Sequence, residues 1–106
     1  MIVLRIDGDI ADLHVGDFEC RCLIPKTERG EYRLSVMEIN GEDVWGIHNR
    51  WFFHTGHSLT DVKSGPVVGD EIVTYNDRYF IRNSRSVLDE LNEFLFQRNE
   101  WTLKIE

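Results

Sequence analysis

Cysteine, proline and long hydrophobic runs are scarce in this sequence, and each absence excludes a class of protein. The 106 residues include two cysteines and two prolines, and no apolar run approaches the ~20 residues that a membrane-spanning helix needs. The apolar start at residues 1–4 is also too short for the core of a signal peptide. We therefore expect a cytoplasmic protein that has neither a disulfide framework nor a membrane anchor.

The two cysteines, Cys20 and Cys22, are separated by one residue. On a strand they would point to the same face roughly 6.5–7 Å apart, which is beyond comfortable disulfide reach. Their spacing also differs from the Cys-x-x-Cys pattern of redox and zinc sites. We expect both thiols to be small residues of the core.

Basic residues are scarce as well, with 12 Lys and Arg against 19 Asp and Glu and a formal net charge of −7. The most basic stretch, residues 78–85, holds only three arginines. Nucleic acids and anionic membranes are bound by clustered Lys and Arg, so both are excluded as direct partners. The acidic surplus fits the simple solubility of a small domain, or a surface that steers toward a basic partner.

Period-two alternation of apolar and polar residues indicates several strands. It predicts strands over 2–6, 18–24 and 32–36, whereas residues 9–16 are interpreted as a connection. The polar stretch 26–30 would be the turn of a hairpin that pairs the second of these strands with the third. We therefore expect strands that are adjacent in the sequence to pair as antiparallel hairpins.

Two dipeptides predict further hairpins because their residues tolerate the positive φ angles of tight turns. They are Asn40-Gly41 and Asn76-Asp77. Just before the first of them, the apolar residues shift from even to odd positions: Met37 and Ile39 follow Leu34 and Val36. This shift indicates a bulge or a strand covered on both faces. The strands joined by the two turns would be 36–39 with 42–47, and 72–75 with 78–81.

One helix is predicted near the C-terminus. Its apolar residues fall on one stripe at helical spacing: Val87, Leu88, Leu91, Phe94 and Leu95. Ser86 and Asp89 resemble a capping box, and Asn99 suits the left-handed residue that ends a helix. For a single domain over residues 1–106 we expect an α+β fold: a mainly antiparallel sheet of hairpins packed against one C-terminal amphipathic helix (about 86–98), closing with a short terminal strand.

The turn-rich stretch 48–70 contains His48, His54 and His57, followed by Asp61. Imidazole and carboxylate groups bind zinc and other divalent ions. Their spacing matches no specific zinc pattern, and the His-Glu-x-x-His motif is absent. We therefore predict no metal site and no cofactor. The alternative is a small metal-dependent or nucleotide-handling enzyme built around these residues.

Asp7-Gly8-Asp9 follows an apolar strand, a placement that can hold magnesium for phosphoryl transfer. Enzymes that use Asp-x-Asp in this way need a parallel sheet with several crossover helices, and this chain has too few residues for them. A calcium loop is excluded because Asp12 stands where such a loop needs glycine. Catalytic triads, phosphate loops and dinucleotide fingerprints are also absent, so we expect no enzymatic activity.

The remaining candidates for function are carboxylates and aromatic residues, which form binding hot spots as well as cores. The predicted partner-binding residues are Asp7, Asp9, Asp12, Asp17, Glu42, Asp43, Trp45 and Trp51. They indicate a small acidic protein-binding module, an inhibitor or immunity-type protein that blocks a larger basic partner such as a toxin, nuclease or defence protein. A further alternative is a structural subunit of a larger assembly, for example in a phage.

Overall fold

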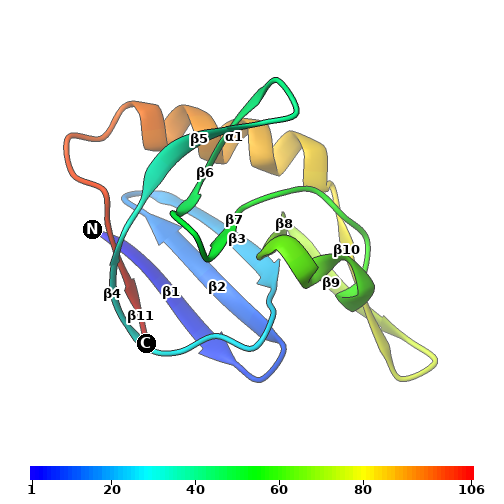
Figure 1. Cartoon of the computed structure of the whole chain (residues 1–106). Coiled ribbons are helices and arrows are strands. Elements are labelled where there is room, and N and C mark those ends of the chain that lie inside the picture. The colour runs from blue at the N-terminus through cyan, green and yellow to red at the C-terminus, as the bar shows by residue number, and fades with distance from the viewer.

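A computed structural model describes all residues from 1 to 106, and its largest element is a six-stranded sheet (Figure 1). The strand order is β4-β11-β1-β2-β3-β8. β1 and β11 are parallel, and every other neighbouring pair is antiparallel. The strands of this large sheet are β1 (Ile2–Asp7), β2 (Ile10–Val15), β3 (Phe18–Leu23), β4 (Gly30–Arg33), β8 (Val67–Gly69) and β11 (Thr102–Ile105).

Five further strands form two smaller sheets. β5, β6 and β7 make an antiparallel small sheet in that order, and β9 pairs with β10 as a separate hairpin. The remaining elements are β5 (Ser35–Ile39), β6 (Glu42–Ile47), β7 (Trp51–Phe52), β9 (Glu71–Tyr75), β10 (Arg78–Arg82), the 3₁₀ helix η1 (Leu59–Ser64) and the helix α1 (Ser84–Phe96). Neither helix is long and apolar enough to cross a membrane. The predicted α+β class is confirmed, with mainly antiparallel strands, one C-terminal α-helix and a short final strand.

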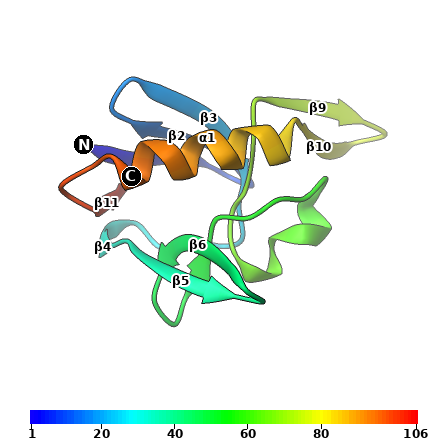
Figure 2. The ribbon, with the colours of Figure 1, turned by 90° about the horizontal axis from the view of Figure 1, so that it is seen from above.

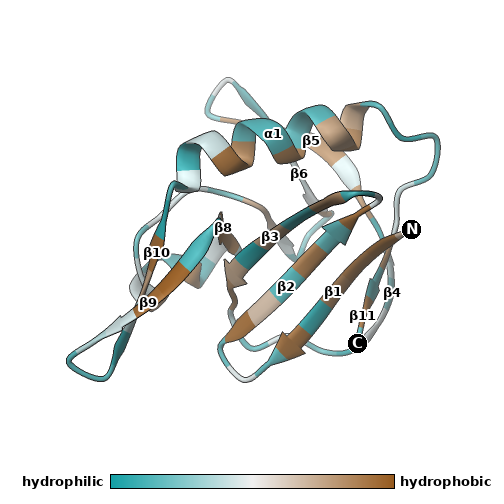
Figure 3. Cartoon of the chain, turned by 180° about the vertical axis from the view of Figure 1, so that it is seen from behind, coloured by the Kyte–Doolittle hydropathy of each residue, from teal (hydrophilic) through white to brown (hydrophobic).

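The main core lies between the large sheet, α1 and the small sheet. In Figure 2, α1 lies between β2 and β3 on one side and the β5–β6 hairpin on the other. Figure 3 shows hydrophobic and hydrophilic residues alternating along most of β2 and β3, whereas the first half of β1 is hydrophobic throughout. The alternation in β2 and β3 turns one face of the large sheet inward. The helix adds the buried part of its predicted stripe: Val87, Leu88, Leu91 and Leu95.

Cys20 and Cys22 are both unbridged and buried in this core, as predicted. A hydrogen bond with Cys20, followed by burial, raises the pKa of the Cys22 thiol well above its ordinary value. The thiol therefore stays uncharged and packs as a small apolar side chain.

A smaller core lies around the far end of β3. Leu23, Val67 and Ile81 are buried there, and partly buried residues of η1 and the β9–β10 hairpin pack against them. Beyond this core, β9 and β10 project from the body as a two-stranded arm (Figure 1). Tyr79 packs against this core and Phe80 forms a bridge with Ser58, so the arm is held along its β10 side.

β2 shows that the prediction of a connection over residues 9–16 is wrong. The segment pairs with β1 on one side and β3 on the other. Tight turns at Gly8 and Gly16, which have φ angles of 65° and 59°, replace the expected long loop. The alternating apolar residues of β2 are fully or almost fully buried: Ala11, Leu13 and Val15.

The predicted hairpin between residues 18–24 and 32–36 is also wrong. β3 pairs with β2 and β8, whereas β4 pairs with β11, so the segment between them crosses the molecule (Figure 1). The parity change at Met37 has a related cause, because the chain leaves the large sheet at the buried Leu34 and enters the small sheet as β5. The register of β5 and β6 is continuous, so no bulge is present.

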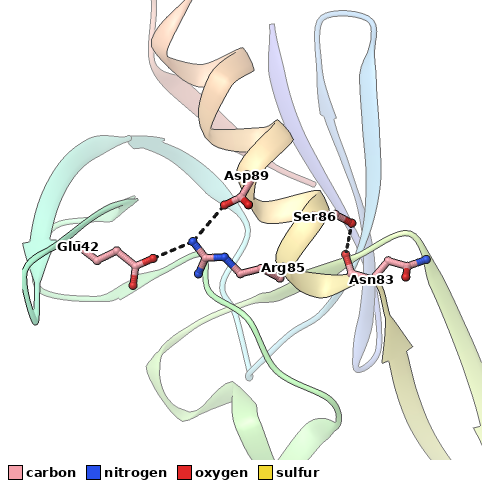
Figure 4. Close-up of polar contacts among 5 residues, drawn as sticks. All are labelled: Glu42, Asn83, Arg85, Ser86 and Asp89. Carbon is pink, nitrogen blue, oxygen red and sulfur yellow. Dashed lines mark hydrogen bonds and ion pairs between the residues drawn. The ribbon is translucent and has the colours of Figure 1, made fainter.

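α1 begins two residues before its predicted start, and its caps differ from the prediction. The N-cap is Asn83, in the left-handed conformation and without a side-chain cap hydrogen bond. Ser86 Oγ instead donates to the Asn83 carbonyl at 3.2 Å, and Asp89 accepts a hydrogen bond from Arg85 (Figure 4). The helix ends at Phe96 with a right-handed C-cap, so Asn99 does not close it.

Candidate functional site

The charges on the strands of the large sheet are balanced. These strands carry four cationic and four acidic side chains: Arg5, Arg21, Arg33 and Lys104 against Asp7, Asp12, Glu19 and Glu31. Arg21 Nε lies 2.7 Å from Asp12 Oδ1, and Arg5 Nε lies 2.8 Å from Glu106 Oε1. The surplus of negative charge therefore lies elsewhere on the molecule.

Most of that surplus lies on α1 and the β5–β6 hairpin. Together these elements hold six carboxylates and one arginine, a formal charge of −5 out of −7 for the chain. Glu38 is the cross-strand partner of Asp43, and Glu93 lies one helical turn after Asp89. Five of the carboxylates, all exposed, are called the acidic face below: Glu38, Glu42, Asp43, Asp89 and Glu93.

Arg85 joins the two halves of the acidic face (Figure 4). Its Nη2 atom lies 2.9 Å from Glu42 Oε1 on β6 and 3.1 Å from Asp89 Oδ1 on α1. The hydrogen bond that Arg85 donates to Glu42, followed by the charge of Asp89, raises the pKa of the guanidinium above its ordinary value. Because all three side chains are more than half exposed, these pairs orient the hairpin against the helix and add little to stability.

Apolar side chains flank the acidic face near the end of α1. Trp45, predicted to contact a partner, is only 4% exposed. Its ring packs on Phe96 and Trp101, with centroid distances of 5.2 and 5.5 Å. Phe96 is 56% exposed, and Val36, the cross-strand partner of Trp45, is 45% exposed. Trp45 is thus the buried support of this surface, and Phe96 and Val36 are its solvent-exposed apolar side chains.

Neither exposed residue is among the partner-binding residues predicted from the sequence. The signal for Phe96 was available, because it falls outside the helical stripe that ends at Leu95. A large apolar residue on the polar side of an amphipathic helix is the kind of exposed group that marks an interface. Val36 had no such signal, since its strand partner and its burial depend on the tertiary fold.

The N-terminal aspartates do not form one surface. Asp7 ends β1 and Asp9 lies in the turn between β1 and β2, whereas Asp17 lies in the turn at the opposite end of β2. A six-residue strand spans about 20 Å, so these turns are well separated. Asp12 lies between them and is paired with Arg21. Of the predicted partner-binding residues, only Glu42 and Asp43 belong to the acidic face.

Trp51 is half-buried on β7, where its ring makes an edge contact with Phe53 at a centroid distance of 5.2 Å. Its strand and β5 are the two edges of the small sheet, separated by β6. Trp51 therefore packs partly into the core and is not part of the acidic face.

The histidine stretch is held together by hydrogen bonds between side chains and backbone groups. His54 contacts carbonyl oxygens with both ring nitrogens, Thr55 O at 2.9 Å and Gly65 O at 2.9 Å. Asp61 Oδ2 accepts the backbone N–H groups of His57 at 2.7 Å and of Ser58 at 3.2 Å. His48 lies apart, in the turn after β6. No three His, Cys, Asp or Glu side chains gather in a geometry that could hold a metal ion.

The role of Asp61 yields a prediction. The hydrogen bonds from His57 and Ser58, with smaller contributions from the charges of His57 and His54, lower the pKa of Asp61 below its ordinary value of 3.8. Its contribution to stability is therefore fully present above about pH 5 and is lost as the pH falls through the folded-state pKa. Asp61→Asn should reduce the free energy of unfolding by about 0.5–1 kcal/mol at pH 7.

Urea unfolding of both proteins between pH 2 and pH 7 measures this effect. The difference between wild type and Asp61→Asn should shrink toward zero at the acidic end, because protonation makes the two side chains alike. Asp77→Asn, which removes an exposed carboxylate at the tip of the β9–β10 hairpin, is the matched control for the change in net charge. A difference that persists at pH 2 would show that Asp61 acts other than through its charge.

The site that emerges is a surface and not a cavity. It combines five exposed carboxylates, one bridging arginine and two exposed apolar side chains on two elements that are joined through Arg85 and Trp45. Such a surface places exposed apolar side chains beside exposed charges, a combination that can serve as a protein-binding patch. No family model, no curated protein and no solved structure matches this chain.

Proposed function

We propose that this protein is a small acidic binding module of the inhibitor or immunity type, which covers a basic surface of a larger partner protein with its acidic face. The observation that carries this proposal is the concentration of charge: −5 of the −7 lies on α1 and the β5–β6 hairpin. A groove that binds nucleic acid would be a suitable target, because it presents Lys and Arg to phosphates.

The acidic face and its apolar neighbours would have separate parts in binding. Exposed carboxylates act through long-range attraction, so they raise the association rate and reject acidic partners. Phe96 and Val36 would supply contacts that exclude water, which mainly slow dissociation. Arg85 holds the hairpin against the helix, so that the carboxylates are arranged before the partner arrives.

Affinity capture with two matched charge-reversal variants tests the proposal. Asp43→Lys/Glu93→Lys alters the acidic face, whereas Asp9→Lys/Asp17→Lys makes the same change in net charge at the two turns of β2. The wild-type protein and the second variant should retain the same basic protein from an extract of the native cell, identified by mass spectrometry. The first variant should bind it about 100-fold more weakly, as two reversed contacts predict.

The association rate of the captured pair gives a second measurement. It should fall at least about tenfold between 50 mM and 500 mM salt, because screening shortens the reach of the carboxylates. Equal retention by both variants would show that the acidic face is not the binding surface. A rate that does not depend on salt, or a partner with an acidic surface, would also contradict the proposal.

A further inference from the structure

β5 is an edge strand with unpaired backbone groups. The turn at Asn40-Gly41 has φ angles of 53° and 80°, both positive, as a two-residue type I′ hairpin requires. The residues that flank such a turn, here Ile39 and Glu42, exchange both hydrogen bonds, and the pattern then alternates along the ladder. The N–H and C=O groups of Val36 and Glu38 therefore point away from β6.

These outward groups have no partner within the protein. Neither residue makes a backbone hydrogen bond outside the ladders. Of the devices by which proteins protect an edge, β5 has no proline, no lysine and no bulge, and its one charged side chain is Glu38. An exposed edge of this kind is a template for an additional strand.

The side chains on this edge specify the strand that would fit. Glu38 and Asp43 are cross-strand partners, and two carboxylates directly opposite each other repel. Neither is in an ion pair with Lys or Arg of the chain. Val36 lies two residues before Glu38, so both share one face of the strand. A complementary strand therefore carries an aliphatic and a basic residue two positions apart.

The protein contains a second hairpin of the same construction that lacks this charge. β9 and β10 are joined by Asn76-Asp77, with φ angles of 51° and 59°, and the same alternation leaves Ile72 and Thr74 facing outward on β9. The two strands carry one Glu and two Arg, so this edge has no acidic surplus. It is a built-in control for strand addition without charge complementarity.

We propose that the β5 edge accepts an extended segment of the basic partner as an additional strand of the small sheet. This inference rests on the proposed function and adds to it the mode of binding and the chemistry of the bound segment. A second copy of this chain is a poorer occupant, because it would bring the Glu38 and Asp43 pairs of both chains together. Strand addition supplies affinity through backbone hydrogen bonds, and the alternate side chains supply specificity.

A synthetic peptide tests strand addition directly. The probe is Ac-Thr-Val-Thr-Lys-Thr-Val-Thr-Lys-NH2, and its control has Glu in place of each Lys. Hydrogen exchange by NMR should show the amides of Val36 and Glu38 slowed at least about tenfold by the lysine peptide, since exchange reports hydrogen bonding of each amide. The glutamate peptide should leave both amides unchanged.

Two proline variants locate the contact. Val36→Pro removes an N–H that β6 does not use, so the hairpin keeps its ladder while the edge loses a donor. This variant should bind the lysine peptide about tenfold more weakly, which corresponds to one net hydrogen bond. Thr74→Pro makes the same change on the β9 edge and should bind as the wild type does. The exchange measurement on the wild-type protein stands even if Val36→Pro fails to fold.

The possible failures separate this inference from the proposed function. If Val36→Pro folds and binds normally while Glu38→Gln/Asp43→Asn loses binding, strand addition is overturned and the acidic face remains a binding surface. Unchanged exchange at Val36 and Glu38, or equal binding of the lysine and glutamate peptides, also overturns strand addition. Dimerisation of the free protein that Val36→Pro abolishes assigns the edge to a second copy and overturns a basic partner strand.

Discussion

Phe53→Ala should destabilise the protein by about 3–5 kcal/mol, as expected for deletion of a buried aromatic ring. Phe53 is fully buried and is the largest of the fully buried side chains. It follows β7 directly, and its N–H donates to the Trp45 carbonyl at 2.9 Å. The ring therefore fills the space where the small sheet meets the main core, and its loss leaves a cavity that the sheets on either side cannot close.

Guanidinium chloride unfolding, followed by tryptophan fluorescence, measures this loss. Phe96→Ala is the matched control, because it removes the same ring from a position that is 56% exposed. The control should lose about 1 kcal/mol or less. Similar losses in the two variants would mean that the core does not depend on Phe53 as its burial indicates.

Gly46→Ala should cost about 2–4 kcal/mol, although it adds only one methyl group. Gly46 is buried in the middle of the small sheet, between β5 and β7. A Cβ atom there would overlap the carbonyl oxygen of Trp51 and would lie 2.5 Å from Phe52 Cα. Both obstacles are backbone atoms, so β7 itself would have to move away from β6.

Gly41→Ala provides the comparison for this second variant. Its Cβ would meet nothing within 4 Å, but its φ angle of 80° disfavours any side chain. The expected loss is about 1 kcal/mol, from backbone strain alone. Thermal unfolding of both variants measures the difference, and a Gly46→Ala protein as stable as the wild type would show that β6 and β7 are not so closely packed.

Local patterns were sufficient for the elements that local physics controls. The turns at Asn40-Gly41 and Asn76-Asp77 require residues that tolerate positive φ, and both form the predicted hairpins. The stripe that includes Leu88, Leu91 and Leu95 is buried as predicted, because helical spacing alone puts these residues on one side. The cap prediction at Ser86 failed because side-chain capping competes with other hydrogen bonds, and here the Asn83 carbonyl takes the serine hydroxyl.

The strand pairing could not be predicted from adjacent segments. β4 pairs with β11, about 70 residues away along the chain, and β2 was overlooked because acidic turn residues bracket its alternating pattern. The pairing partner of a strand is selected by the face that must be buried and by the elements that cover it. That selection depends on contacts between distant segments, which no local pattern contains.

The sequence by itself determined the net charge of −7, the α+β class and the separation of acidic residues into groups along the chain. Only the tertiary structure decided which groups meet. It separates the aspartates at the two ends of β2 and joins Glu42 to Asp89 through Arg85. It also buries Trp45 and leaves Phe96 exposed. The physical reason is that charge is a sum over residues, whereas an electrostatic surface and a burial pattern depend on distances, and distances between remote residues exist only once the chain has folded.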